Sequence, residues 1–499
     1  MLAAVFLNPL LMKLRFFYFA LLLLSPLIVY EAAIFADYGL RDDYSITRET
    51  HEEPGKVLAF TASHGRPLYG IFLEAGYRQI PLIADLTWLR LLSAVFITLF
   101  GLFLYRQLQR NGWEPFESAA TALIVTFLPA SQVTISWAVG WPWGISLMLA
   151  ILGFRMSEAG WRRSGFSRIW RVTGAIIAYM LATPIYQSNT LFAVALLASV
   201  LLSPQFNANN KTKIIQRSVF HLVILFIALV LSYGLLQWFF YHGIFHESGR
   251  LQFETNIISK LIWFLSLSLP NALAFLTLRD DFATGVLLFW CVFCVVMWFI
   301  LFAFYKQIHK KCFLHWFLCL LILPWIAHGI SLLAAERALG YRTTFALSGL
   351  AVVILIASIR EVLPSSLRYM VISLIVIISA IQASWQSYQL IAVPQSREWG
   401  MIKNVVANMQ PGVSTMIYLI EPKPVDRSTD RVYRDEFGSF TSNSEWAPDE
   451  MFKAAVHERF PQGIPQPWHY EFYHGGEPPP VTDHYDQIID MRTLRQWRK

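Results

Sequence analysis

Long apolar stretches separated by short polar gaps fill most of the first 391 residues of the chain. Each stretch is about twenty residues long, which is the length that a helix needs to cross roughly 30 Å of hydrocarbon. The stretches lie at 16–36, 85–105, 117–136, 139–157, 172–187, 189–203, 218–241, 282–305, 313–334, 343–359 and 369–391. The pattern predicts an all-α polytopic membrane domain, residues 1–391, with about eleven transmembrane helices.

The basic residues of the short gaps set the predicted orientation. If the N-terminus is cytoplasmic, every Lys-rich or Arg-rich short gap falls on the cytoplasmic side, as the positive-inside rule requires. These residues are Arg106, Arg110, Arg155, Arg162, Arg163, Arg168, Arg171, Lys211, Lys213, Arg217, Lys306, Lys310, Lys311, Arg360 and Arg368. The same orientation places residues 37–81, the first outer loop, outside.

A second outer loop is predicted at residues 242–281. Its apolar part, 257–278, resembles a span, but counting it as one would invert every later gap and place Lys310 and Lys311 outside. We therefore expect an interfacial or re-entrant helix there, a position that suits Trp263 and Phe264.

The chain becomes charged and rich in Pro and Gly after residue 391. This change predicts a small extracytoplasmic α/β domain at 392–499. Its expected helices lie at 396–409 and 448–458, and its expected strands at 413–420 and 486–489.

The composition agrees with a membrane protein and narrows its chemistry. The chain is 56% hydrophobic and 15% charged, with a net charge of +7, whereas soluble domains have about 25% charged residues. The basic residues sit in topological gaps, so a nucleic-acid partner is disfavoured and a lipid bilayer is expected. No phosphate-binding loop, dinucleotide fingerprint or zinc signature is present in the sequence. An outward-facing enzyme would therefore take its activated substrate from the membrane.

Two adjacent carboxylates, Asp42 and Asp43, open the first outer loop. One could act as a general base toward an acceptor hydroxyl, or the pair could hold a divalent cation such as Mg²⁺ or Mn²⁺. A solvated acidic loop is the plain alternative. Arg66 precedes Pro67, which fixes the local backbone, and its guanidinium suits either a phosphate or a lipid headgroup. His64 is a weaker candidate in the same loop.

A late outer loop carries Glu336, Arg337, Tyr341 and Arg342. Its two guanidiniums fall on the same predicted face as the Asp pair and could bind a lipid phosphate. The alternative is a local Glu336–Arg337 contact with Arg342 reaching the headgroup region.

Two further residues are secondary candidates. Asp85 lies at the outer start of the second predicted span, where an ionisable group is often functional but also less costly than at mid-membrane. Trp141 belongs to an aromatic run that is typical of a membrane interface and could also stack on a sugar ring.

With these residues in place, the chain resembles the GT-C superfamily of polyprenyl-phosphate-dependent glycosyltransferases. The resemblance rests on the cytoplasmic N-terminus, the paired acids in the first outer loop, the many spans and the outer C-terminal region. The spacing of Asp42-Asp43 before Gly65-Arg66-Pro67-Leu68 is similar to that of the O-antigen glucosyltransferases that convert bacterial serotype. The layout covers most of residues 1–391, and the motif about thirty residues.

The resemblance implies inverting transfer of one sugar from a polyprenyl-phosphate donor to a glycan or glycolipid, at the outer face of a bacterial inner membrane. It implies Asp42 or Asp43 as catalytic base and Arg66, Arg337 and Arg342 as donor-phosphate ligands, and it leaves metal dependence open. Two other functions remain open from the sequence: a lipid-linked sugar flippase or transporter, and a glycan polymerase or ligase that works through the 242–281 segment.

Overall fold

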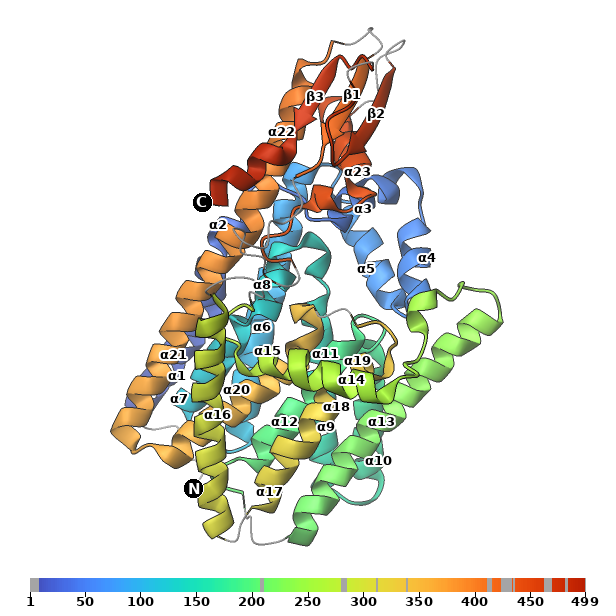
Figure 1. Ribbon diagram of the computed structural model, residues 1–499. Coiled ribbons are helices and arrows are strands. Elements are labelled where there is room, and N and C mark those ends of the chain that lie inside the picture. The colour runs from blue at the N-terminus through green and yellow to red at the C-terminus, as the bar shows by residue number, and fades with distance from the viewer. Residues whose placement is uncertain are drawn as a thin grey trace.

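The computed structural model describes residues 9–206, 211–279, 285–310, 313–337, 340–410, 415–422, 433, 436–461, 469–480 and 483–498. Long helices form the body of an elongated molecule, and three short strands lie at one end of it (Figure 1). Within these described ranges, six helices are long and apolar enough to cross a membrane. They are Ile83–Arg110, Ala138–Trp161, Lys211–Tyr241, Leu287–His309, Tyr341–Val362 and Ser365–Asn408.

The structure confirms a mostly helical chain with membrane-length helices, and it places a helix at each of the predicted apolar stretches. A bent pair raises the count of six to seven if it is taken as one span. Three other apolar helices, Leu14–Val29, Gln187–Leu201 and Leu314–Ala327, are shorter. The number eleven therefore stays a prediction.

The apolar part of the second predicted outer loop is helical. It consists of α14 (Ile257–Trp263), a π-helical turn (Phe264–Ser268) and α15 (Leu269–Leu273). This run crosses the long helices α13 (Lys211–Tyr241) and α16 (Gly285–His309) and does not lie alongside them (Figure 1). Its placement along the membrane surface stays a prediction.

A buried arginine fastens the start of the first outer loop to α6 (Leu86–Arg110). Arg90 is fully buried, and its guanidinium donates hydrogen bonds to the carbonyls of Ile34, Ala36 and Tyr38 over 3.0, 2.6 and 2.8 Å. These carbonyls follow or end α2 (Glu31–Ile34), where a helix leaves its last carbonyls without internal partners. The guanidinium also lies 4.2 Å from the centre of the Tyr38 ring.

Proline explains the bent helix pair α7 (Pro115–Thr126) and α8 (Pro129–Ser136), whose axes differ by 54°. Leu128 has the extended backbone that a following proline favours, so one helix ends and another begins at Pro129. The turn after α8, Ala138–Gly140, passes so close to α8 that a Cβ at Gly140 would lie 2.3 Å from the Thr134 carbonyl oxygen. Only glycine fits there.

The C-terminal region holds three parallel strands in the order β2-β1-β3. They are β1 (Thr415–Ile420), β2 (Tyr470–Gly475) and β3 (Gln487–Asp490), with α23 (Ala447–Arg459) beside them (Figure 1). The two helices and two strands expected from sequence are present within three residues of their predicted ends, and β2 was not expected. The predicted boundary at residue 392 falls inside a continuous helix, in which α21 (Ser365–Gln386) passes through a π-helical turn (Ser387–Ala392) into α22 (Val393–Asn408).

The first outer loop and the C-terminal region share one apolar core. Its buried members include Tyr44 and Tyr77 from the loop and Trp399, Phe437 and Met451 from the C-terminal region. A separate, larger apolar core lies among the long helices. Burial of large aromatic side chains on both sides makes the loop and the C-terminal region one packed unit.

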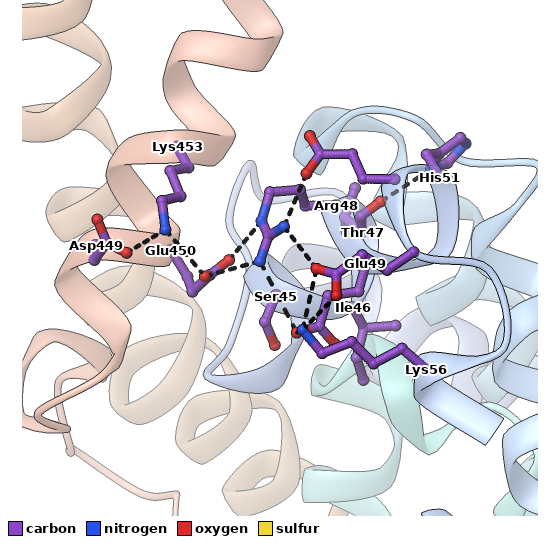
Figure 2. A network of polar contacts seen from close by, with 12 residues as sticks. Ser45, Ile46, Thr47, Arg48, Glu49, His51, Lys56, Asp449, Glu450 and Lys453 are labelled. Atoms are coloured by element: carbon purple, nitrogen blue, oxygen red, sulfur yellow. Dashed lines mark hydrogen bonds and ion pairs between the residues drawn. The ribbon is translucent and has the colours of Figure 1, made fainter. Parts of the chain in front are cut away.

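Charged side chains join the same two segments at their surface. Helix α3 (Asp42–Glu52) faces α23, and the Arg48 guanidinium donates to both carboxylate oxygens of Glu450 over 2.9 Å each (Figure 2). Lys453 and Asp449 extend the network on α23, and Lys56 extends it on the loop side (Figure 2). A bidentate pair of this kind fixes orientation as well as distance.

We predict that Arg90→Met destabilises the protein by about 3 kcal/mol, because three buried carbonyls lose a charged donor and the methionine cannot replace it. Thermal unfolding of the purified protein in detergent measures the change. Arg106→Met, at an exposed position near the C-terminal end of the same helix, is the matched control and leaves the unfolding temperature close to that of the wild type. Equal unfolding temperatures for the two variants would contradict the role of Arg90.

Candidate active site

The two adjacent aspartates have different environments. The Asp43 carboxylate is fully buried and accepts hydrogen bonds from the Leu40 amide (2.9 Å), the Tyr77 hydroxyl (2.5 Å) and the Val139 amide (3.3 Å). Asp42 is half-buried and lies at the first position of α3. Asp43 therefore ties the loop to α5 (Pro67–Tyr77) and to the turn after α8, whereas Asp42 faces a more open environment.

Burial raises the pKa of Asp43 from 3.8 to about 6, and the hydrogen bond from Tyr77 opposes part of this rise. A carboxylate that already accepts three hydrogen bonds is a poor metal ligand. Among the described residues, no group of three or more His, Cys, Asp or Glu side chains is placed to hold a metal ion. Because protein donors occupy the Asp43 oxygens, the Asp pair does not fit the predicted two-carboxylate cation site.

Arg66 stands directly before α5, with Pro67 at the first helical position. Its Nε donates to the Gln187 side-chain oxygen over 2.9 Å, and its guanidinium lies 5.0 Å from the centre of the Tyr186 ring. The Gln187 amide donates in turn to the carbonyls of His64 and Gly65. These contacts hold Arg66 in one orientation from both sides.

An aromatic wall lies next to these charges. The Trp143 ring centre is 4.8 Å from Tyr186, 6.3 Å from Tyr69 and 6.3 Å from Trp137. The indole N–H groups of Trp137 and Trp143 are buried and have no hydrogen-bond partner among the described residues. They are donors available to a ligand.

Tyr69 is a buried phenol of this wall, and charges from three parts of the chain act on it. Burial raises the pKa of the Tyr69 phenol, and the charges of Arg66, Asp42 and Arg342 also act on it. Coulomb interactions weaken with distance, so one acid and two guanidiniums lie within electrostatic range of the same phenol.

Arg342 belongs to the short helix Tyr341–Thr344 and is oriented by a residue of the C-terminal region. Its guanidinium lies 4.6 Å from the centre of the Trp137 ring, and its Nη1 donates over 3.1 Å to Glu436. The other oxygen of Glu436, a fully buried residue, is 2.8 Å from Nε of Arg41. Glu436 thus bridges Arg342 and the residue that precedes Asp42.

Arg41 has φ 47°, the only positive φ of a non-glycine residue in the described part of the chain. This positive-φ conformation is sterically unfavourable for a residue with a Cβ and costs about 1–3 kcal/mol. Besides Glu436, Thr441 holds it, by accepting a hydrogen bond from the Arg41 amide over 3.1 Å. The C-terminal region therefore maintains the strained turn from which Asp42 and Asp43 project.

The structure places Asp42, Arg66 and Arg342 within electrostatic range of Tyr69 and gives Arg337 a different set of contacts. Arg337 donates to Glu254 over 2.9 and 3.0 Å and to Ser259 over 2.6 Å, both in the second outer segment. The Glu336 carbonyl accepts a hydrogen bond from Lys260 over 2.7 Å. The predicted Glu336–Arg337 contact is not among the ion pairs of the described residues.

The other sequence candidates have mainly packing or capping contacts. His64 lies at the end of α4 (Lys56–Ser63), and its ring bonds the Phe60 carbonyl over 2.7 Å. Trp141 is buried between Phe72 and Phe96, which argues against sugar stacking on it. The Tyr341 hydroxyl accepts the Arg279 amide over 3.0 Å, and Asp85 is half-buried before α6.

Sequence reasoning missed Tyr69, Tyr77, Tyr186, Arg90 and Glu436. Tyr186 lies in a predicted apolar stretch, and Tyr69 and Tyr77 lie among apolar residues of the first outer loop. Aromatic residues are ordinary in such surroundings, so no pattern distinguished them. Glu436 is one of many acids in a charged region. Only Arg90 carried a signal: an arginine in the first turns of an otherwise apolar predicted span.

Comparison with known proteins gives no family assignment. No protein-family model matches the chain, and no curated protein is significantly similar to it.

The raised pKa of Asp43 predicts a pH dependence of stability. Because the folded-state pKa of about 6 exceeds the ordinary value of 3.8, the folded state binds this proton more tightly. The contribution of Asp43 is complete below about pH 4 and is lost as the pH rises through about 6. Asp43→Asn cannot titrate, so its unfolding temperature falls less steeply between these values. Glu52→Gln, exposed on the same helix, keeps the wild-type slope; the same slope in Asp43→Asn would contradict the assignment.

Glu436→Gln should loosen both segments that Glu436 bridges. Loss of the buried charge leaves Arg41 and Arg342 with a weaker partner, at a cost of about 1–2 kcal/mol. Hydrogen–deuterium exchange measured by mass spectrometry should rise in residues 38–44 and 340–345. Glu445→Gln, an exposed carboxylate of the same region, should leave both segments protected as in the wild type. Unchanged hydrogen–deuterium exchange in Glu436→Gln would contradict the role of Glu436 as a bridge between Arg41 and Arg342.

Proposed function

We propose that this chain is an inverting glycosyltransferase that moves a sugar from a polyprenyl-phosphate donor to a glycan or glycolipid acceptor. The observation that carries the proposal is the placement of two guanidiniums on one aromatic wall: Arg66 lies over Tyr186 and Arg342 over Trp137, and both rings lie against Trp143. Glu436 joins Arg342 to Arg41, the residue before Asp42. One acid next to two guanidiniums fits a reaction in which a hydroxyl loses a proton and a phosphate leaves. The resemblance of the first outer loop to GT-C enzymes supports the same reaction.

In this mechanism Asp42 is the general base. It accepts the proton of the acceptor hydroxyl while the hydroxyl oxygen attacks the anomeric carbon of the donor sugar. The bond between the anomeric carbon and the phosphate oxygen breaks on the opposite face, and its electron pair leaves with polyprenyl phosphate. Attack from the face opposite the leaving group inverts the anomeric configuration.

The two guanidiniums stabilise the leaving phosphate. Arg66 is held by Gln187 and Tyr186, and Arg342 by Glu436 and Trp137. Preorganised donors of this kind act where negative charge develops and need no rearrangement during the reaction. The buried Asp43 is assigned a positioning role, because its oxygens are occupied by protein donors.

The proposal includes a topology. With the N-terminus in the cytoplasm, the predicted eleven spans place the Asp42 loop and an α/β C-terminal domain outside a bacterial inner membrane. A lipid-linked donor could then reach the site from the outer leaflet. The charge distribution of the short gaps supports this orientation.

One observation favours a second candidate, a flippase for lipid-linked sugars. Broken helices at membrane depth are common in transporters, and α7 and α8 form a pair bent by 54°. A flippase would move its lipid without breaking a glycosidic bond.

We predict that Asp42→Asn lowers sugar transfer by about 10²- to 10⁴-fold, because the general base is lost. Proteoliposomes supplied with a panel of radiolabelled polyprenyl-phosphate sugars and bacterial envelope glycans measure transfer and the release of polyprenyl phosphate. Glu52→Gln, exposed on the same helix, is the matched control and retains transfer.

The same proteoliposomes separate the two candidate functions. If a fluorescent polyprenyl-phosphate sugar crosses the bilayer at equal rates with the wild type and Asp42→Asn, and no polyprenyl phosphate is released, the flippase is supported and the transferase is wrong. Full transfer activity in Asp42→Asn would also overturn the catalytic assignment.

A further inference from the structure

A cavity of about 460 Å³ lies outside the site described above, between α22 and the start of the first outer loop. One wall is the helix face that carries Ser396, Gly400 and Asn404, and the opposite wall includes Ala36 and Asp37. The volume falls in the range of small-molecule binding sites, which is about 300–1,000 Å³.

Glycine forms the floor of the cavity. Ser396, Gly400 and Asn404 follow each other at four-residue intervals, so they lie along one face of the helix. Gly400 occupies the middle of this face, and a Cβ added there would meet no atom within 4 Å. The space in front of this position is therefore open.

The lining combines exposed polar groups with an aromatic surface. Asn404 and Arg397 are exposed side chains of the cavity lining. Tyr388 adds a phenol ring that is 38% exposed, whereas Trp399 is 1% exposed and packs on Tyr44.

The charges of the cavity are mixed. Lys403 lies 3.0 Å from Asp37 and 3.3 Å from Glu458, so its charge is largely compensated, and Arg397 adds a second cation at the rim. Donors and acceptors side by side with aromatic rings suit a ligand with many hydroxyl groups and little net charge. A fully anionic ligand would face the Asp37 carboxylate.

The cavity adjoins the turn that bears the candidate base. The Trp399 ring centre is 5.3 Å from that of Tyr44, the residue after Asp43. Asp37, which also lines the cavity, lies a few residues before the same turn. Arg90 donates hydrogen bonds to the carbonyls of its two neighbours, Ala36 and Tyr38. A ligand bound here would lie beside the Asp42 loop.

We infer that this cavity is a saccharide-binding subsite that holds an extended part of the acceptor glycan away from the reacting hydroxyl. The assignment of the ligand as the acceptor rests on the proposed function. Saccharide binding to the cavity does not depend on sugar transfer. Asn404, Arg397 and Asp37 supply hydrogen bonds, and Tyr388 supplies an apolar face for a sugar ring.

Saturation-transfer NMR on the full-length protein in a detergent without sugar groups tests the inference. The probes are maltotriose, cellotriose and chitotriose, with glycerol 3-phosphate as a non-saccharide anion. At least one trisaccharide should bind the wild type, and Gly400→Leu should weaken that binding by about tenfold or more by filling the floor. Gly234→Leu, on α13, is the matched control, because a Cβ there also meets no atom within 4 Å, and it should bind like the wild type.

Three results would overturn the inference: no trisaccharide binds the wild type, Gly400→Leu binds as the wild type does, or glycerol 3-phosphate displaces the trisaccharide and Arg397→Gln abolishes binding of both. Asp42→Asn separates this test from that of the proposed function. If trisaccharide binding depends on Gly400 while Asp42→Asn retains full transfer, the subsite stands and the catalytic assignment fails. If Asp42→Asn loses transfer and Gly400→Leu still binds, the subsite alone fails.

Discussion

The burial of Asp43 is the constraint on which the outer part of this structure depends. A carboxylate removed from water must be paired with hydrogen-bond donors. The donors to Asp43 come from the backbone just before α3, from α5 and from the turn after α8. The bend at Pro129 and the close approach at Gly140 are what bring the Val139 amide to it. The residue next to Asp43 in sequence thereby acquires a fixed position without being buried itself.

The C-terminal region contributes more than an appended fold. Its turn at 436–442 reaches Arg41 and Arg342 through Glu436 and is fastened to α22, where the Glu398 carboxylate accepts the amides of Thr441 and Ser442 over 2.9 and 2.7 Å. Helix α23 is joined to α3 by the ion pair between Glu450 and Arg48. The strained Arg41 backbone persists because surrounding contacts over-determine it, which is the usual condition for strain at functional sites.

Hydropathy and charge were sufficient to predict the helical class, the positions of the apolar helices and most elements of the C-terminal region, because these follow from local periodicity. They also selected Asp42, Asp43, Arg66 and Arg342 as candidate site residues, because their types and their places in polar gaps are unusual. The contacts that orient them could not be predicted. Glu436 meets Arg41 across 395 positions of sequence, and Gln187 meets Arg66 across 121, distances over which no single-sequence pattern carries information. Arg337 was also a candidate by its type and loop; in the structure it pairs with Glu254 of the second outer segment, and its role stays a prediction.

The helix that runs unbroken from Ser365 to Asn408 joins the long apolar helices to the C-terminal region. At 1.5 Å per residue its 44 residues span about 66 Å, far more than a hydrocarbon core. Its only irregularity, the π-helical turn at 387–392, is braced where the Leu390 carbonyl accepts the Gly438 amide over 2.6 Å. A helix in a bilayer adjusts its tilt to the local thickness. A change in the tilt of this helix would move Glu398 and the turn at 436–442 that Glu398 holds. The position of Asp42 would then depend on the thickness of the lipid bilayer.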